Sequence, residues 1–181
     1  MDGTMVEAAL HRIAQEIVEA NPDLDNVVLL GVLSRGRPLA DRLTQEVREL
    51  TGHKLRVGSL ATTLYRDDLR SGSIPAVAGS ETHFDFDIHG ATVILVDDVL
   101  STGRTIRAAL DEIIDYGRPA RIQLACLVDR GLRELPIQAD YLGWTISTRA
   151  DDHVAVHVRE LDGEDAVLHV RPVATTGEGE P

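Results

Sequence analysis

Residues 92–110 read TVILVDDVLSTGRTIRAAL, and this stretch decides the fold around it. Its first five residues are apolar or β-branched, which is typical of a buried strand. Two adjacent carboxylates, Asp97 and Asp98, follow at once. After a short loop of small residues, apolar side chains recur at helical spacing from Ile106 onward. The stretch therefore predicts a strand, an acidic edge and a loop that opens a helix.

The loop between this strand and this helix has the chemistry of a phosphate site. A helix N-terminus leaves several backbone N–H groups unpaired and carries a partial positive charge. Small residues let a phosphate approach those donors closely. We therefore expect the loop to bind a sugar phosphate through Ser101, Thr102, Gly103, Arg104 and Thr105.

The adjacent carboxylates suit another part of the same ligand. Carboxylates accept hydrogen bonds from sugar hydroxyls, and their hard oxygens hold divalent cations such as Mg²⁺. Asp97 and Asp98 are therefore expected to bind a ribose or a metal ion, and a phosphorylated ribose would occupy both the carboxylates and the loop. The simpler alternative is a capped turn with two solvated aspartates, which explains the turn but not the adjacent pair.

Composition restricts the class of protein. The chain has 181 residues, 43% hydrophobic and 27% charged, which predicts one globular domain over residues 1–172. Its Gly- and Glu-rich end, residues 173–181, is expected to be disordered. The longest apolar run, residues 27–33, is too short to cross a membrane, and no leader pattern is visible. The single cysteine, Cys126, fits a reducing compartment, so we expect a cytoplasmic protein.

Alternation of helical patterns with apolar runs predicts the architecture. Helices are expected at about residues 5–20, 39–50 and 104–117, and strands at 27–33, 55–64, 92–96 and 121–128. This order predicts an α/β fold with a doubly wound, mostly parallel sheet.

Three further segments are predicted around that sheet. The irregular residues 70–90 are expected to form a lid. Residues 135–144 are expected to form a small cap beside the sheet. Alternating apolar residues in 154–170 predict a C-terminal β-hairpin that turns at the Asp-Gly pair, 162–163.

Loops with polar chemistry follow four of the predicted strands, at 34–38, 65–68, 97–105 and 128–133. Parallel strands end at a common edge of a sheet, and sites on open α/β sheets form there. Convergence of these loops on one pocket is therefore expected, which favours an enzyme.

Several segments together carry a resemblance to a known family. DDVLSTGRT at 97–105 resembles the signature with which type I phosphoribosyltransferases bind 5-phosphoribosyl 1-pyrophosphate (PRPP). TLYRDDL at 63–69, GRPARIQLA at 117–125 and the DRG–RELPI–ADY pattern of 129–141 resemble the PyrR family. That family comprises pyrimidine-operon regulators that are also uracil phosphoribosyltransferases. The resemblance implies the type I phosphoribosyltransferase fold and a Mg²⁺-dependent reaction of uracil with PRPP that yields UMP and pyrophosphate.

The resemblance also implies a pyrophosphate loop at Ser34, Arg35 and Gly36. This loop often contains a non-proline cis peptide bond in the superfamily, which is expected at Ser34–Arg35. From the residues alone, an exposed turn with solvated arginines is the alternative.

Roles for further residues follow from the same resemblance. Arg66 matches the residue that reaches pyrophosphate, and it is expected to act in catalysis with Asp97 and Asp98. Without the family, a surface ion pair of Arg66 is an equally good interpretation. Backbone groups of Val128 and Arg130 are expected to recognise the base.

The family's regulatory role implies further partners, namely UMP or UTP and a stem-loop in leader mRNA. Binding to RNA phosphates requires a basic surface, whereas this chain has a formal net charge of −12. Leu132, Gln138 and Trp144 stand where the family often carries histidine, arginine and lysine, although Arg12 and Arg133 remain. The sequence therefore favours the enzyme over the RNA-binding regulator, with a purine-specific phosphoribosyltransferase as a third option.

Apolar residues on a former polar surface often pack against a partner. Leu132 and Trp144 are such residues, so a homodimer or a higher homo-oligomer is expected.

Overall fold

The structure is a computed structural model that describes residues 1–62 and 81–171. The predicted catalytic Arg66, most of the predicted lid and the predicted tail lie outside the described residues. Within the described part, no helix is long and apolar enough to cross a membrane.

A five-stranded sheet forms the centre of the molecule, in the order β2-β1-β3-β4-β5. Every neighbouring pair runs parallel. The strands are β1 (Val27–Val32), β2 (Arg56–Leu60), β3 (Thr92–Leu100), β4 (Arg121–Asp129) and β5 (Tyr141–Thr145). The predicted α/β fold with a doubly wound parallel sheet is therefore confirmed.

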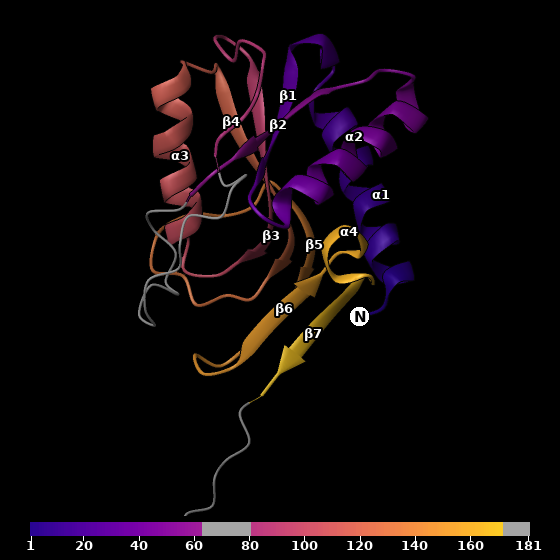
Figure 1. Ribbon diagram of the computed structural model, residues 1–181, viewed down its shortest axis with the longest axis vertical. Helices are drawn as coiled ribbons and strands as arrows, with labels where there is room; N and C mark the ends of the chain where they lie inside the picture. Colours follow the sequence, from indigo (N-terminus) through magenta and orange to yellow (C-terminus); the bar gives the residue numbers. More distant parts are fainter. Residues whose placement is uncertain (63–80, 172–181) are drawn as a thin grey trace, which may run out of the picture.

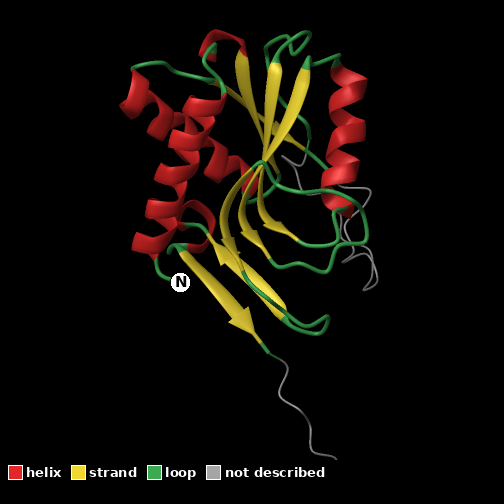
Figure 2. Ribbon diagram, turned by 180° about the vertical axis from the view of Figure 1, so that it is seen from behind, coloured by secondary structure: helices red, strands yellow, loops and turns green. Residues whose placement is uncertain are grey.

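Helices cover both faces of this sheet. Helices α1 (Gly3–Ala20) and α2 (Gly36–Thr51) lie on one face, and α3 (Arg104–Tyr116) lies on the other (Figures 1 and 2). A short 3₁₀ helix, η1 (Leu24–Asn26), precedes β1. Alternate residues of each strand point to opposite faces, so Leu29 packs with α1 and α2 while Leu30 packs with α3. Both faces are therefore buried, as the continuous apolar strands predict.

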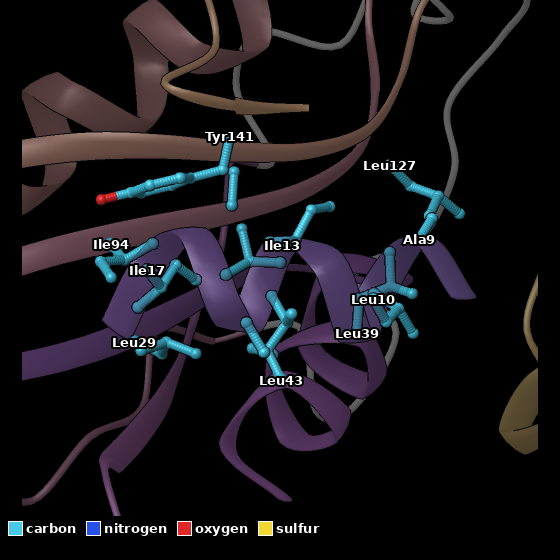
Figure 3. Close-up of a cluster of buried hydrophobic side chains, with 14 of the residues drawn as sticks. Ala9, Leu10, Ile13, Ile17, Leu29, Leu39, Leu43, Ile94, Leu127 and Tyr141 are labelled. Carbon is cyan, nitrogen blue, oxygen red and sulfur yellow. The ribbon is translucent and has the colours of Figure 1, made fainter. Parts of the chain in front are cut away.

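The core beneath α1 illustrates why this segment folds as a helix. Its buried residues recur at helical spacing from Val6 to Ile17, which produces one apolar stripe. Figure 3 shows Leu10, Ile13 and Ile17 from this stripe against side chains of α2 and the sheet. The stripe fixes α1 on the sheet and positions the neighbouring α2.

The segment predicted as a cap at 141–144 is instead the edge strand β5, so that prediction is wrong. Residues Ala125–Asp129 of β4 pair with it in parallel register. Gly143 permits the close approach, because a Cβ there would lie 2.3 Å from the carbonyl oxygen of Leu127. Trp144 also differs from expectation, since it packs partly buried against the core rather than standing on the surface.

A C-terminal hairpin, residues 153–170, follows the sheet as predicted. It consists of β6 (His153–His157), α4 (Arg159–Asp162) and β7 (Ala166–Val170), with β6 and β7 antiparallel. The Asp-Gly pair does not form the predicted two-residue turn. The carboxylate of Asp162 accepts the N–H of Val158 (2.9 Å), which favours a helical turn, and Gly163 ends that turn at φ +79°.

Ion pairs attach the C-terminal hairpin to the helices. Arg42 of α2 donates to Glu160 and to Asp165 (2.8 Å), and Arg159 donates to Asp165 (2.7 Å) and to Glu7 of α1. The terminal amino group of Met1 donates to the carbonyl of Val167 (2.8 Å). Residues from both ends of the chain thus hold the hairpin against α1 and α2.

Asp165 gives a test of this attachment. Its side chain is only 5% exposed. Burial raises its pKa, but hydrogen bonds from Arg42 and from the N–H of Arg159 outweigh burial, so the pKa lies below the ordinary value. Substituting Asp165→Asn should lower the free energy of unfolding by about 2 kcal/mol at pH 7, measured by urea denaturation.

The pH dependence supplies the control. A carboxylate whose pKa is lower in the folded state than in the unfolded state stabilises the fold. This stabilisation is complete above the pKa of aspartate in the unfolded chain, about 3.9, and is lost as the pH falls through the folded-state pKa. The difference between the natural protein and the variant should therefore shrink below about pH 4. A constant difference down to pH 2 would contradict the ionic role of Asp165.

Candidate active site

The carboxyl ends of β1 and β3 lie side by side, at the point where the strand order changes direction. The chain passes from β1 through α2 to β2 on one side, and from β3 through α3 to β4 on the other. Crevices on open α/β sheets form at such a switch point. A cavity of about 70 Å³ lies here, lined by Val32, Leu33, Ser34, Arg35, Asp97, Asp98 and Thr105. The structure thus brings together residues predicted from two separate loops.

The paired carboxylates belong to the strand itself rather than to the loop after it. Strand β3 continues to Leu100 because it pairs with β4 as far as Asp129. The N–H of Asp98 donates to Oδ1 of Asp97 (3.0 Å), and the N–H of Val99 donates to Oδ1 of Asp98 (3.0 Å). Asp97 is only 6% exposed. These contacts hold both carboxylates at the wall of the cavity.

The loop after β1 forms the opposite wall. A Cβ at Gly36 would lie 2.3 Å from the carbonyl oxygen of Val96, and a Cβ at Gly31 would lie 2.4 Å from Cα of Arg37. Because glycine has no Cβ, the start of α2 can fold back onto β1 and approach β3. These glycines therefore determine how closely the two walls approach each other.

The cis peptide bond of this loop lies at Leu33–Ser34, one residue before the predicted Ser34–Arg35 bond. Leu33 still pairs with β2, since its N–H donates to the carbonyl of Leu60 (2.9 Å). Arg35 already has helical angles, φ −84° and ψ −25°. The reversal of the chain therefore occurs at Ser34, before the bond that the sequence suggested.

The loop at 101–105 opens α3 as predicted, and backbone contacts hold it in place. Gly103 precedes α3 at φ +92°, and the N–H of Arg104 donates to Oγ1 of Thr102 (3.3 Å). The carbonyl of Thr102 accepts the N–H groups of Glu134 (3.0 Å) and Leu135 (3.1 Å). Of the residues in this loop, Thr105 lines the cavity.

The guanidinium of Arg104 lies elsewhere. It pairs with Glu134 at 2.6 Å (Nη2) and 2.8 Å (Nε), beside a second hollow of about 250 Å³ between α3 and residues 134–135. Its side chain therefore does not join the cavity residues, and a phosphate would meet the backbone of this loop.

Val128 and Arg130 do not line the cavity either. Val128 is fully buried between β3 and β5. The guanidinium of Arg130 donates to Oγ1 of Thr148 (3.2 Å) and to the carbonyls of Arg149 (3.1 Å) and Asp152 (2.7 Å). The side chains of Val128 and Arg130 are therefore engaged in the fold, and their backbone groups are the parts that could meet a ligand.

Two residues at the site were not predicted in their observed roles. Arg133 donates to the carbonyls of Ser101 (2.6 Å) and Ile137 (2.7 Å) and pairs with Asp129, so it fixes the loop after β3 to the end of β4. Asp162 pairs with Arg35, at 2.8 Å and 3.2 Å. The contacts of Arg133 with Ser101 and of Arg35 with Asp162 have no local sequence signal, because these partners are far apart along the chain.

The donor set at the cavity fits Mg²⁺ better than a metal held by protein ligands alone. Among residues 1–62 and 81–171, no group of three or more His, Cys, Asp or Glu side chains could hold a metal ion. Two carboxylates at the wall of a cavity match Mg²⁺, which usually takes one or two carboxylates and completes its shell with water and substrate oxygens.

Comparisons with known proteins agree with this geometry. The family described as "Phosphoribosyl transferase domain" matches residues 2–162. A "Bifunctional protein PyrR" from Chloroflexus aurantiacus is 53% identical over 166 residues, covering 92% of this chain and 91% of its own. One from Clostridioides difficile is 49% identical over 168 residues, covering 92% of this chain and 94% of its own.

Solved structures resemble the chain in fold alone. The hypoxanthine phosphoribosyltransferase of Trypanosoma cruzi superposes with a TM-score of 0.69, at 17% identity, and the match covers 96% of this chain and 95% of that chain.

The contact of Gly36 with β3 can be tested by Gly36→Ala. The added Cβ would meet the carbonyl of Val96, so the loop must move away from β3. We expect the free energy of unfolding to fall by about 2–3 kcal/mol in urea denaturation, because overpacking a fixed backbone contact is costly.

Gly52→Ala is the matched control. Gly52 ends α2 at φ +76° with no atom within 4 Å of its Cβ position, so the cost should be backbone strain alone, about 1 kcal/mol. Equal costs for the two variants would show that the contact at Gly36 does not constrain the loop.

Proposed function

The chain belongs to the PyrR family of phosphoribosyltransferases, and on that basis we propose that it transfers the phosphoribosyl group of PRPP to uracil. The products are UMP and pyrophosphate. One observation carries the proposal: Asp97, Asp98 and Thr105 share a cavity with Ser34 and Arg35 at the switch point of the sheet. A ribose, its 5-phosphate and its pyrophosphate group need this combination of acceptors and donors.

Each part of PRPP has a place in this proposal. The 5-phosphate binds the N-terminus of α3, with the backbone of residues 101–105 and the hydroxyl of Thr105 as donors. The ribose hydroxyls donate to Asp97 and Asp98. The pyrophosphate group lies against Ser34 and Arg35, whose loop is held beside β3 by the contact of Gly36 with Val96.

The reaction exchanges one bond at the ribose for another. A ring nitrogen of uracil forms a bond to C1 while the bond from C1 to pyrophosphate breaks, and pyrophosphate leaves with the electron pair of that bond. The proton of the ring nitrogen passes to solvent. Positive charge develops on the ribose in the transition state, and the fixed carboxylates of Asp97 and Asp98 stabilise it. When bound, Mg²⁺ on these carboxylates would neutralise charge on the leaving group.

Recognition of uracil is assigned in this proposal to backbone groups near Val128 and Arg130, whose side chains have other partners. Arg66 is proposed to reach the pyrophosphate. A purine base is the alternative substrate. A competition assay between uracil, hypoxanthine and guanine distinguishes the two possibilities.

A second function is regulatory binding of leader RNA with UMP or UTP as effector, and the names of the bifunctional relatives favour it. The described structure limits the cations available for it. Arg12 donates to Glu16 (3.0 Å) and to the carbonyl of Gly143 (2.6 Å), and Arg133 is occupied at the loop after β3. RNA phosphates would therefore have to compete with these internal partners or bind other groups of this acidic chain.

We also propose a cytoplasmic location and a homo-oligomer, at least a dimer. Leu132 supports the latter, since its side chain is 39% exposed at a positive φ of 62°. Sedimentation that shows only monomer would contradict it.

Asp98→Asn tests the enzyme. Loss of the charge beside the ribose should reduce the rate of UMP formation from uracil and PRPP by at least about 100-fold. Asp111→Asn is the control, because it removes the same charge from an exposed surface pair with Arg107 on α3 and should leave the rate unchanged.

Two outcomes would count against the proposal. Equal rates for Asp98→Asn and Asp111→Asn would exclude a catalytic role for the carboxylate. Absence of turnover in the natural protein with uracil and with every other nucleobase would exclude the enzyme itself.

Filter binding with a stem-loop RNA from a pyrimidine-operon leader tests the second function. We expect retention at about 50 mM salt in the presence of UMP and none at about 200 mM, because phosphate contacts weaken steeply with salt. A stem-loop of shuffled sequence is the control. If no RNA is retained even at the lower salt, the regulatory function is wrong for this chain.

A further inference from the structure

One wall of the cavity is connected to the C-terminal hairpin. Arg35 lines the cavity, and its guanidinium binds Asp162, which is 127 residues away in α4. Nη2 donates to Oδ1 (2.8 Å) and Nε donates to Oδ2 (3.2 Å). Such a two-bond fork fixes the plane of the guanidinium as well as its position.

The carboxylate of Asp162 is itself held in place. Its Oδ2 also accepts the N–H of Val158 (2.9 Å), and the side chain is 18% exposed. The hydrogen bonds from Arg35 and then from Val158 lower the pKa of Asp162. The carboxylate is therefore charged at neutral pH and anchored to the backbone of its own turn.

The turn that carries Asp162 is fastened to the rest of the protein. Arg42 of α2 binds Glu160 and Asp165 on either side of it, and Arg159 binds Asp165 and Glu7. An isolated surface pair contributes little because both side chains can move. Here one partner is attached to an anchored turn, so the position of α4 determines the position of the guanidinium.

The fork leaves one part of Arg35 unused. Among the described residues, Nη1 has no hydrogen-bond partner, while Nε and Nη2 are both engaged. We propose that Asp162 is a positioning residue for phosphoribosyl transfer, which holds Arg35 at the cavity so that Nη1 remains for the pyrophosphate group of the substrate. This inference rests on the proposed function and assigns a role in the reaction to the C-terminal hairpin.

The hypothesis gives Asp162 no contact with the substrate. Without the fork, Arg35 would retain its charge but would have to be ordered on each binding event, which costs side-chain entropy. Binding of PRPP and pyrophosphate should weaken, while the chemical step of the bound complex should change little.

Asp162→Asn is the test. An amide keeps the shape but replaces one acceptor by a donor, so it cannot accept both bonds of the fork. We expect KM for PRPP and Kd for inorganic pyrophosphate, measured calorimetrically with Mg²⁺, to rise about tenfold, and kcat to change less than about threefold.

Glu164→Gln is the matched control, since it removes an exposed carboxylate two residues from Asp162 that pairs with His157 and contacts neither Arg35 nor the arginines that hold the turn. Its KM and Kd should equal those of the natural protein. In an Arg35→Ala background, adding Asp162→Asn should have no further effect on either constant. Arg35→Lys provides a variant that leaves α4 intact, and because lysine cannot form the fork it should reproduce the rise in Kd.

The possible outcomes distinguish a failure of the positioning role of Asp162 from a failure of the proposed function. If Asp162→Asn behaves like Glu164→Gln, or still weakens binding after Arg35 is removed, Asp162 does not position Arg35. If Asp162→Asn does not fold, Arg35→Lys decides: an unchanged Kd for pyrophosphate overturns the inference. If the natural protein makes no UMP, the proposed function fails, whereas the pyrophosphate titrations still decide the role of Asp162.

Discussion

The parallel pairing of β1 with β3 is the constraint on which the site depends. Gly31 lies opposite Val96 in this pairing, and the chain leaves the two strands toward opposite faces of the sheet. The loops after the strands therefore diverge and leave a crevice between them. Gly36 then packs against the carbonyl of Val96, which limits the width of that crevice. The two walls of the cavity are thus determined by the core, independently of any ligand.

The charge of the chain is a second constraint on the site, because the proposed substrate is an anion and the chain itself has a net charge of −12. Most of the arginines near the sheet edge and the hairpin are used for internal bonds: Arg12, Arg42, Arg130, Arg133 and Arg159. Among the residues that the structure describes, the N-terminus of α3 and Arg35 lie beside the cavity, and Nη1 of Arg35 has no hydrogen-bond partner among them. Attraction of the anion is therefore local, which fits a small phosphorylated ligand better than an extended polyanion.

The sequence predicted the elements whose apolar periodicity is strong. The strand beginning at Thr92 and the helix ending near Gly117 were found where the pattern placed them, because burial on both faces demands continuous apolar runs. Strand β5 was missed, since Tyr141, Leu142 and Trp144 surround a glycine and do not alternate with polar residues in the sequence. The Asp-Gly signal at 162–163 was misleading because Asp162 bonds back to Val158 and completes a helical turn. The hydrogen bond between Val158 and Asp162 thus outweighed the turn preference of the Asp-Gly pair, and the local sequence pattern does not contain this hydrogen bond.

At the site, the sequence could identify residues but not their partners. Asp97, Asp98 and Thr105 lie in one contiguous motif, so their spacing along a strand and a helix start fixed their common edge. The orientation of Arg35 depends on Asp162, and the loop after β3 depends on Arg133; both pairs join segments that only the fold brings together. The motif residues supply the groups that bind the ligand, while charged residues distant in the sequence determine where those groups lie. The C-terminal hairpin, which carries no motif of its own, therefore belongs to the site as much as the loops that define it.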